Sequence, residues 1–234
     1  MIHYLVYDGQ SSLEYGVHIS GTETFDAPER DITALSIPGR NGDLIFDNGR
    51  YKNIDVTYPA FIHRNFARNA QAMRAWLMKS PGYKRLEDTY HPDLYRLAYF
   101  KGPVDFETTF LNWGGETELV FTCKPQRFFV AGDLPIDFLG HGTINNEYMP
   151  AKPLIKVYGS GAGDLNVGEH VVNISDIDEY VMLDCDLMDA YKGTENKNST
   201  ITAPEFPVLE PGANSISWTG GITSIQITPR WWTI

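Results

Sequence analysis

Residues 154–185 read LIKVYGSGAGDLNVGEHVVNISDIDEYVMLDC, and this stretch decides the fold class. It contains four short apolar runs, at residues 154–158, 164–167, 170–174 and 180–185. Turn-forming residues separate these runs, at Gly159–Gly163, Gly168-Glu169 and Ser175–Glu179. Strands spaced this closely, with no helical period between them, are typical of antiparallel sheets. We therefore expect consecutive β-hairpins in this part of the chain.

The same pattern continues toward the C-terminus, where strands are predicted at 206–209, 215–219 and 224–228. Together these strands predict an antiparallel β-sandwich or jelly roll over residues 150–234. Toward the N-terminus the periodicity fades between Val130 and Pro153, where Gly, Asn and Pro accumulate. We place a linker at 136–149 and a separate N-terminal domain at 1–135.

The N-terminal domain is predicted to be rich in β-strands and to contain one helix. Strands are expected at 4–7, 54–58, 94–100, 104–110 and 116–123. Asn65 is the expected N-cap of the helix. The apolar stripe of this helix consists of Phe66, Ala70, Met73 and Leu77. Ser80-Pro81-Gly82 should end the helix, because the residue before proline disfavours helical geometry.

The composition agrees with a mostly β protein and excludes several functions. Hydrophobic residues make up 42% of the chain, charged residues 21% and aromatic residues 13%, with 21 Gly and 14 Pro. The net charge of −11 argues against binding to nucleic acid or to an anionic membrane, because both require clustered basic residues.

Cysteine content and the chain start indicate the compartment. Cys123 and Cys185 are far apart and lie in apolar runs, which excludes a disulfide framework and predicts two buried thiols. The N-terminal Met1–Tyr4 shows no secretory signal, and no apolar run approaches the roughly 20 residues of a membrane helix. We expect synthesis and folding in a cytoplasm.

No constellation of residues predicts catalysis, a cofactor or a metal. Gly159–Gly163 lacks the following helix that a phosphate-binding loop requires, so a flexible hairpin turn is favoured. Asp176–Glu179 lacks the Gly and Glu of a calcium-binding EF-hand loop, and Asp184–Asp186 is explained by one polar strand edge. The sequence contains no G-x-S-x-G motif and no pair of histidines at i, i+4. A hydrolase would need two carboxylates about 5 to 10 Å apart in a cleft, which nothing in the sequence requires.

Trp218, Trp231 and Trp232 raise the question of glycan binding. Exposed tryptophan rings present a rigid, amphipathic face on which a sugar ring can stack. Adjacent Trp231 and Trp232 cannot both face inward on a strand, so one of them is a candidate for such a role. The alternative is that this ring caps the sandwich edge or contacts another domain.

A tight projecting loop is predicted within Leu35–Leu44, which reads LSIPGRNGDL. Proline presets φ, the two glycines permit positive φ, and Asn-Gly is a favoured type I′ pair. The charged residues of the loop are then left free to pair with a neighbour. The candidate assembly loop consists of Pro38, Gly39, Arg40, Asn41, Gly42 and Asp43.

This loop resembles the signature of the siphophage distal tail protein family. Other segments agree with the family in the same order along nearly the whole chain: 73–77 (MRAWL), 81–83 (PGY), 121–128 (FTCKPQRF), 153–159 (PLIKVYG), 183–186 (LDCD), 190–191 (AY), 206–214 (FPVLEPGAN) and 227–231 (ITPRW).

The resemblance implies a non-enzymatic structural protein of the virion, at the distal end of the tail. It implies an N-terminal domain, based on a β-sandwich, that forms a hexameric ring, and a peripheral domain similar to galectins and carbohydrate-binding modules. Such a ring joins the tail tube to the tail-tip hub or baseplate and lets DNA pass, a role with which an acidic chain is compatible. The implied partners are further copies of the chain, the tail tube protein, and the tail-associated lysin or receptor-binding proteins of the hub. The short second domain leaves no room for a large extra arm, which argues against a direct grip on receptor-binding proteins.

The alternative function is that of a carbohydrate-binding adhesion module that contacts the host cell wall. An exposed face of Trp218, Trp231 or Trp232 over a groove would favour it.

Overall fold

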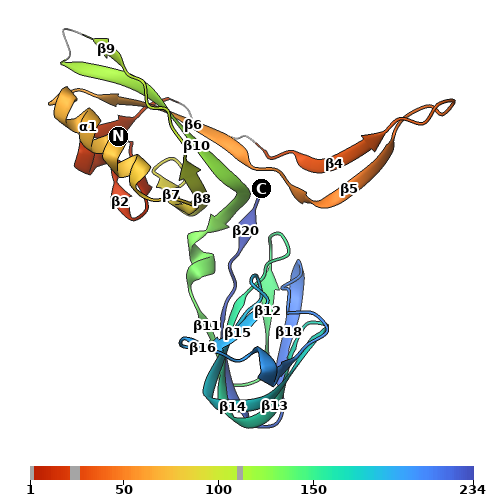
Figure 1. Ribbon diagram of the computed structural model, residues 1–234. Helices are drawn as coiled ribbons and strands as arrows, with labels where there is room; N and C mark the ends of the chain where they lie inside the picture. The colour runs from red at the N-terminus through yellow and green to blue at the C-terminus, as the bar shows by residue number, and fades with distance from the viewer. Residues whose placement is uncertain (1–2, 22–26, 110–112) are drawn as a thin grey trace. The chain divides into compact units, whose positions relative to one another are not determined.

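The computed structural model describes residues 3–21, 27–109 and 113–234. The chain divides into two compact units, Met1–Arg127 with Ile234, and Phe128–Thr233. Strands dominate both units, and α1 (Phe66–Lys79) is the one α-helix among the described residues (Figure 1). The prediction of a mostly β protein with a single helix is confirmed.

The first unit is built on an antiparallel sheet with the order β2-β1-β7-β8-β10-β6-β3, and β9 also pairs with β10. The elements are β1 (Leu5–Tyr7), β2 (Gln10–Ser11), the 3-10 turn η1 (Ser12–Tyr15), β3 (Val17–Ile19), β6 (Ile54–Ile62), β7 (Lys84–Asp88), β8 (Leu94–Phe100), β9 (Glu107–Thr109) and β10 (Gly114–Phe129). β8 has the predicted bounds, whereas β9 is shorter than the strand expected at 104–110, whose last residue lies outside the described residues. Met1 and Ile2, at the start of the chain, also lie outside them.

Helix α1 covers this sheet with the apolar stripe that the sequence predicts. Ala70, Met73 and Leu77 are buried in one core with strand residues, and Trp76 donates a hydrogen bond from Nε1 to the Tyr7 carbonyl at 3.3 Å. The expected cap is only partly realised. Asn65 stands at the N-cap position, but its φ of 50° is left-handed and its side chain makes no capping hydrogen bond.

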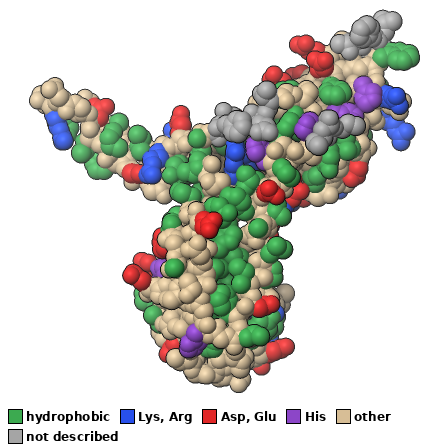
Figure 2. All heavy atoms as spheres, turned by 180° about the vertical axis from the view of Figure 1, so that it is seen from behind, with side chains coloured by type: hydrophobic (Ala, Val, Ile, Leu, Met, Phe, Trp, Pro, Cys, Tyr) green, Lys and Arg blue, Asp and Glu red, His purple; other side chains and the backbone are tan. Residues whose placement is uncertain are grey.

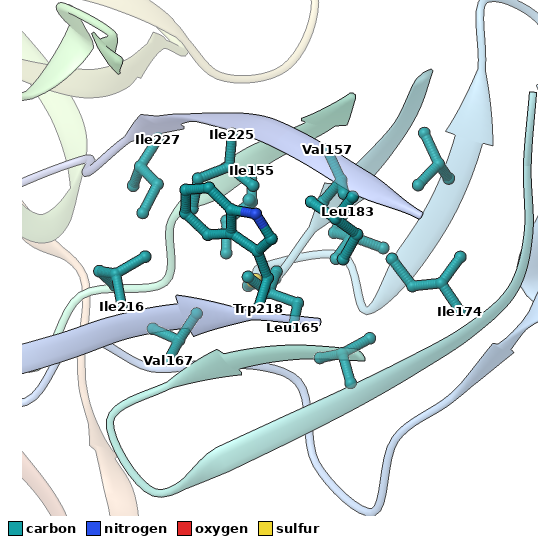
Figure 3. Packing of buried hydrophobic residues seen from close by; sticks show 14 of the residues in the cluster. Ile155, Val157, Leu165, Val167, Ile174, Leu183, Ile216, Trp218, Ile225 and Ile227 are labelled. Carbon is teal, nitrogen blue, oxygen red and sulfur yellow. The ribbon is translucent and has the colours of Figure 1, made fainter. Parts of the chain in front are cut away.

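The second unit is a sandwich-like arrangement of antiparallel strands. Its elements are η2 (Val130–Asp133), β11 (Ile136–Phe138), β12 (Gly142–Asn146), β13 (Leu154–Val167), β14 (His170–Asp184), β15 (Asp189–Lys192), β16 (Glu195–Asn196), η3 (Asn198–Thr200), β17 (Ile201–Thr202), β18 (Gly212–Trp218), β19 (Ile222–Thr228) and β20 (Trp232–Thr233). The first half of β13 pairs with β19 and its second half with β18. Along its other edge β13 pairs with β14, with a register shift between Gly161 and Gly163. Side chains of both halves, such as Val157 and Leu165, pack into one core (Figure 3).

Four expectations for this unit need correction. Residues 206–209 form no strand apart from an isolated bridge between Leu209 and Ala151, and Ser175–Glu179, expected as a turn, lies within β14. Gly159–Gly163 is not a hairpin turn but the middle of β13, where glycine is required because a Cβ on Gly159 would lie 2.2 Å from the Gly221 carbonyl oxygen. The segment expected as a linker, 136–149, contains β11 and β12 and belongs to the second unit. Its glycines and prolines mark turns between short strands, which local composition does not distinguish from a linker.

Candidate functional site

A two-stranded ribbon interrupts the first unit between β3 and β6. It consists of β4 (Arg30–Leu35) and β5 (Leu44–Tyr51), which pair with each other in a sheet of their own (Figure 1). A backbone hydrogen bond of 2.9 Å from the Lys52 amide to the Glu29 carbonyl closes its base. We call residues 29–52 the ribbon. Among the described residues no other strand pairs with either of its strands.

The ribbon carries apolar side chains on both of its faces. Because paired residues share a face, the register places Leu35, Leu44 and Phe46 on one face. The opposite face carries Ile32, Ala34 and Ile45. The four large side chains Ile32, Leu35, Ile45 and Phe46 are 46%, 53%, 53% and 52% exposed. Figure 2 shows such side chains along the ribbon between charged ones.

Ion pairs link the two strands near the base of the ribbon. Arg30 pairs with Asp47, and Arg50 donates from Nε to Asp31 Oδ2 at 2.6 Å. The hydrogen bond from Arg50 lowers the pKa of Asp31. The pKa of Asp47 is lowered by the Gly49 amide and by Arg30. These carboxylates are therefore charged at neutral pH, but exposed ion pairs of this kind add little stability.

The tip of the ribbon is the loop that the sequence singled out. The Arg40 amide donates to the Ile37 carbonyl at 3.1 Å, and Gly39 has a φ of 80°, so Pro38-Gly39 occupy the centre of a type II turn. Gly42 also has positive φ, at 79°, but Asn41 does not, and the predicted type I′ pair is wrong. Within the described residues, Arg40 and Asp43 have no ion-pair partner.

The charge of the ribbon differs from that of the chain as a whole. Four acidic residues (Glu29, Asp31, Asp43, Asp47) and four basic ones (Arg30, Arg40, Arg50, Lys52) cancel. The net charge of −11 therefore resides entirely outside the ribbon. A ribbon with no net charge can approach another acidic molecule without net repulsion.

The three tryptophans proposed for glycan stacking lie in or against the core of the second unit. Trp218 and Trp231 are only 8% and 9% exposed. Trp232 is half-buried, packs against the same core, and donates from Nε1 to the Pro150 carbonyl at 2.9 Å. Trp218 and Trp231 thus present no free ring face, which leaves the glycan-binding alternative without its expected stacking surface at these two positions.

The residues considered for chemistry are engaged in structural roles. Cys123 and Cys185 are free and buried, as predicted, and burial raises the pKa of each thiol to about 12. Asp184 does not form an exposed polar edge; it is buried and bound by both terminal nitrogens of Arg230. In the described part of the chain, no three His, Cys, Asp or Glu side chains are placed to hold a metal ion. No described helix is long and apolar enough to cross a membrane.

The sequence prediction identified the ribbon tip but missed its two strands. The signal was present: the apolar runs Ile32–Leu35 and Leu44–Phe46 lie on either side of a Pro-Gly turn, which is a hairpin pattern. No residue type in these runs indicates that their side chains stay exposed. This property follows only from the absence of a covering element among the described residues.

Several solved structures share this fold. The crystal structure of SPP1 Dit (gp 19.1), described as a paradigm of the hub adsorption apparatus in phages that infect Gram-positive bacteria, matches with a TM-score of 0.76 and 11% sequence identity, over 97% of this chain and 98% of that one. A chain of the phage P2 baseplate in its activated conformation with Ca matches with a TM-score of 0.56 and 9% identity, over 100% and 99% of the two chains. The corresponding structure with Sr gives a TM-score of 0.51 and 10% identity, over 96% and 97%. No protein-family profile and no curated protein sequence matches the chain. The shared fold, along nearly the full length of both chains, is the one that the sequence resemblance implied.

Proposed function

We propose that this chain is a distal tail protein, a non-enzymatic structural component at the tail tip of a long-tailed bacteriophage. Copies of the chain assemble into a ring, which the family resemblance implies to be hexameric. The ring joins the tail tube to the tail-tip hub or baseplate, including its tail-associated lysin or receptor-binding proteins, and lets DNA pass. The fold shared with phage hub and baseplate proteins supports this proposal.

The observation that carries the proposal is the ribbon with two uncovered apolar faces. A two-stranded hairpin is marginally stable in water by itself, and it is stabilised when a hydrophobic face is covered. Exposed edges and apolar faces also invite unwanted association, so a soluble chain rarely keeps them without a partner. A neighbouring copy that covers the ribbon would stabilise the hairpin and would shield its edges and apolar faces.

Ring closure needs heterologous contacts, in which one surface of each copy meets a different surface of the next. The ribbon supplies the first surface, and its tip adds one cation and one anion, Arg40 and Asp43, which have no ion-pair partner in the described part of the chain. The acidic remainder of the chain fits a passage for DNA, because a lining without clustered basic residues does not retain phosphate.

The test compares variants with a matched control. Leu35→Ser with Phe46→Ser removes apolar side chains from one ribbon face, and the control Leu139→Ser with Leu187→Ser removes side chains that are 87% and 70% exposed in the second unit. Light scattering measures the mass in solution. In a second assay, purified chain is added to a phage assembly extract that lacks this chain, and the yield of joined tails is measured. Arg40→Ala with Asp43→Ala tests the tip in the same two assays.

We expect the ribbon variant to lose ring assembly and tail joining while the control keeps both. The proposal fails if the ribbon variant joins tails as well as the unmodified chain does. It also fails if the unmodified chain stays at its monomer mass of 26.4 kDa even beside its tail neighbours.

A further inference from the structure

The ribbon contains two Asn-Gly dipeptides, Asn41-Gly42 at its tip and Asn48-Gly49 in β5. Asparagine is a chemically labile residue. In its main reaction, the backbone nitrogen of the next residue loses its proton and attacks the side-chain amide carbon. A following glycine favours this step, because it has no Cβ to shield the nitrogen and adopts the required backbone geometry easily.

We propose that Asn41 is a site of spontaneous deamidation and that Asn48 is protected by the ribbon itself. At Asn41, the Gly42 nitrogen forms a bond to the side-chain carbon and ammonia leaves, which gives a five-membered succinimide. Water then opens the ring at either carbonyl and leaves aspartate or isoaspartate at position 41. One water is consumed and one ammonia is released, with no other reactant.

The surroundings of Asn41 leave both reacting groups free. Asn41 and Gly42 are exposed and lie beyond the last paired residues of the strands, Leu35 and Leu44. Within the described residues, neither the Gly42 N–H nor the Asn41 side chain has a hydrogen-bond partner. Apart from the two chain neighbours of Gly42, no described heavy atom lies within 4 Å of the position of a Cβ on this residue, so no other part of the chain crowds the dipeptide.

The second dipeptide, Asn48-Gly49 in β5, has polar neighbours at both of its residues. The Gly49 N–H donates to Asp47 Oδ1 at 2.9 Å, which ties up the nucleophilic nitrogen, and the nearby negative charge disfavours its deprotonation. Asn48 also contributes to lowering the pKa of the Asp31 carboxyl, which places its side chain beside that carboxylate. We expect Asn41 to deamidate about tenfold faster than Asn48, or more. This factor corresponds to the free energy of one hydrogen bond to a charged acceptor.

Deamidation would change the charge of the ribbon. Its formal charge of zero becomes negative, next to Asp43, and isoaspartate also lengthens the backbone of the loop. The consequence for assembly rests on the proposed function: a negative tip on an acidic molecule should join tails less efficiently. The covalent chemistry does not depend on that function.

The test follows the purified full chain at mildly alkaline pH and body temperature by peptide mapping with mass spectrometry. Conversion replaces NH by O at Asn41, and its rate should rise in proportion to hydroxide concentration. A parallel sample in urea, in which both dipeptides are free, should convert Asn41 and Asn48 at similar rates. The variant Asn41→Gln should abolish the reaction at position 41 and leave position 48 unchanged.

An intact Asn41 in the folded chain, or equal rates at the two positions before unfolding, would overturn the proposal. A separate arm compares Asn41→Asp with Asn41→Gln in the tail-joining assay. If the peptide map shows deamidation but Asn41→Asp joins tails normally, the chemistry stands and the role of the tip in assembly fails.

Discussion

The ion pair between Arg230 and Asp184 allows a quantitative test of how the second unit is held together. Arg230 Nη1 and Nη2 donate to the two carboxylate oxygens of Asp184 at 2.8 and 2.9 Å. Asp184 also accepts hydrogen bonds from the amides of Asp186 and Leu187, so its carboxylate fixes the turn after β14. The side chains are 8% (Asp184) and 28% (Arg230) exposed. The pair thus fastens the end of β14 to the segment that follows β19.

Arg230→Met keeps an unbranched side chain in place of the apolar stem of arginine and removes the charged guanidinium. Removing one partner of a fully buried pair costs about 3 to 5 kcal/mol, because the other charge stays buried without compensation. Arg230 is partly exposed, and Asp184 keeps its two amide donors, so we expect a smaller loss of roughly 2 to 3 kcal/mol. Asp184→Asn in the same background removes the stranded charge, and the double variant should lose less stability than the sum of the two single variants.

Hydrogen exchange measured by mass spectrometry reports the free energy of opening for β13 and β14 separately from the first unit. The expected loss should appear in these strands and leave exchange of α1 unchanged. The hydrogen bond from Arg230 lowers the pKa of Asp184 below its ordinary value of 3.8. The stabilisation is therefore present above that value and is lost as the pH falls through the lower folded-state pKa. The difference between Arg230→Met and the unmodified chain should shrink in acid. A loss below about 0.5 kcal/mol, the range of ordinary surface substitutions, or strictly additive single variants, would refute this reasoning.

Three further predictions concern the two cores. Gly159→Ala should destabilise the second unit by about 1 to 3 kcal/mol in urea unfolding, because the added Cβ lies 2.2 Å from the Gly221 carbonyl oxygen; an unchanged midpoint would contradict the close approach of the two strands. Phe121→Ala should cost the first unit about 3 to 5 kcal/mol, since this fully buried ring contacts Tyr7, Tyr58 and Phe100; a loss confined to the second unit would be inconsistent with its placement. Cys123 and Cys185, with pKa values of about 12, should resist a thiol reagent at neutral pH until urea exposes them. Rapid labelling of the folded chain would show that one of these thiols is accessible.

Elements with strong periodicity were predictable from the sequence, because local side-chain order determines them. The apolar stripe of α1 and the bounds of β8 are examples. Gly159–Gly163 was not predictable as a strand, since five small residues in a row locally favour a turn. Only the approach of Gly221, in the turn before β19 and more than fifty residues later, explains why glycine stands at position 159.

In the candidate site too, local sequence predicts some features, and others depend on the rest of the structure. Pro38 and Gly39 define a turn locally, and the structure forms one there. The adjacent apolar residues read as an ordinary hairpin, and nothing in their sequence distinguishes a covered ribbon from an uncovered one. For Trp231 and Trp232, alternation required one ring to face outward, but the hydrogen bond from Trp232 to Pro150 shows how an outward ring can still be held against its own unit.

The distribution of charge distinguishes two ways in which the ribbon could bind a neighbour. Each copy carries −11 outside the ribbon and zero within it, so copies repel one another at long range while the ribbon itself contributes no net repulsion. If burial of Ile32, Leu35, Ile45 and Phe46 drives association, added salt should strengthen it, because screening weakens the repulsion and leaves the apolar contact intact. If ion pairs from Arg40 and Asp43 drive it, salt should weaken association instead. About half of each large apolar side chain is uncovered, whereas the tip offers two solvated charges. Pairing of such charges at a surface contributes little. We therefore expect added salt to strengthen association.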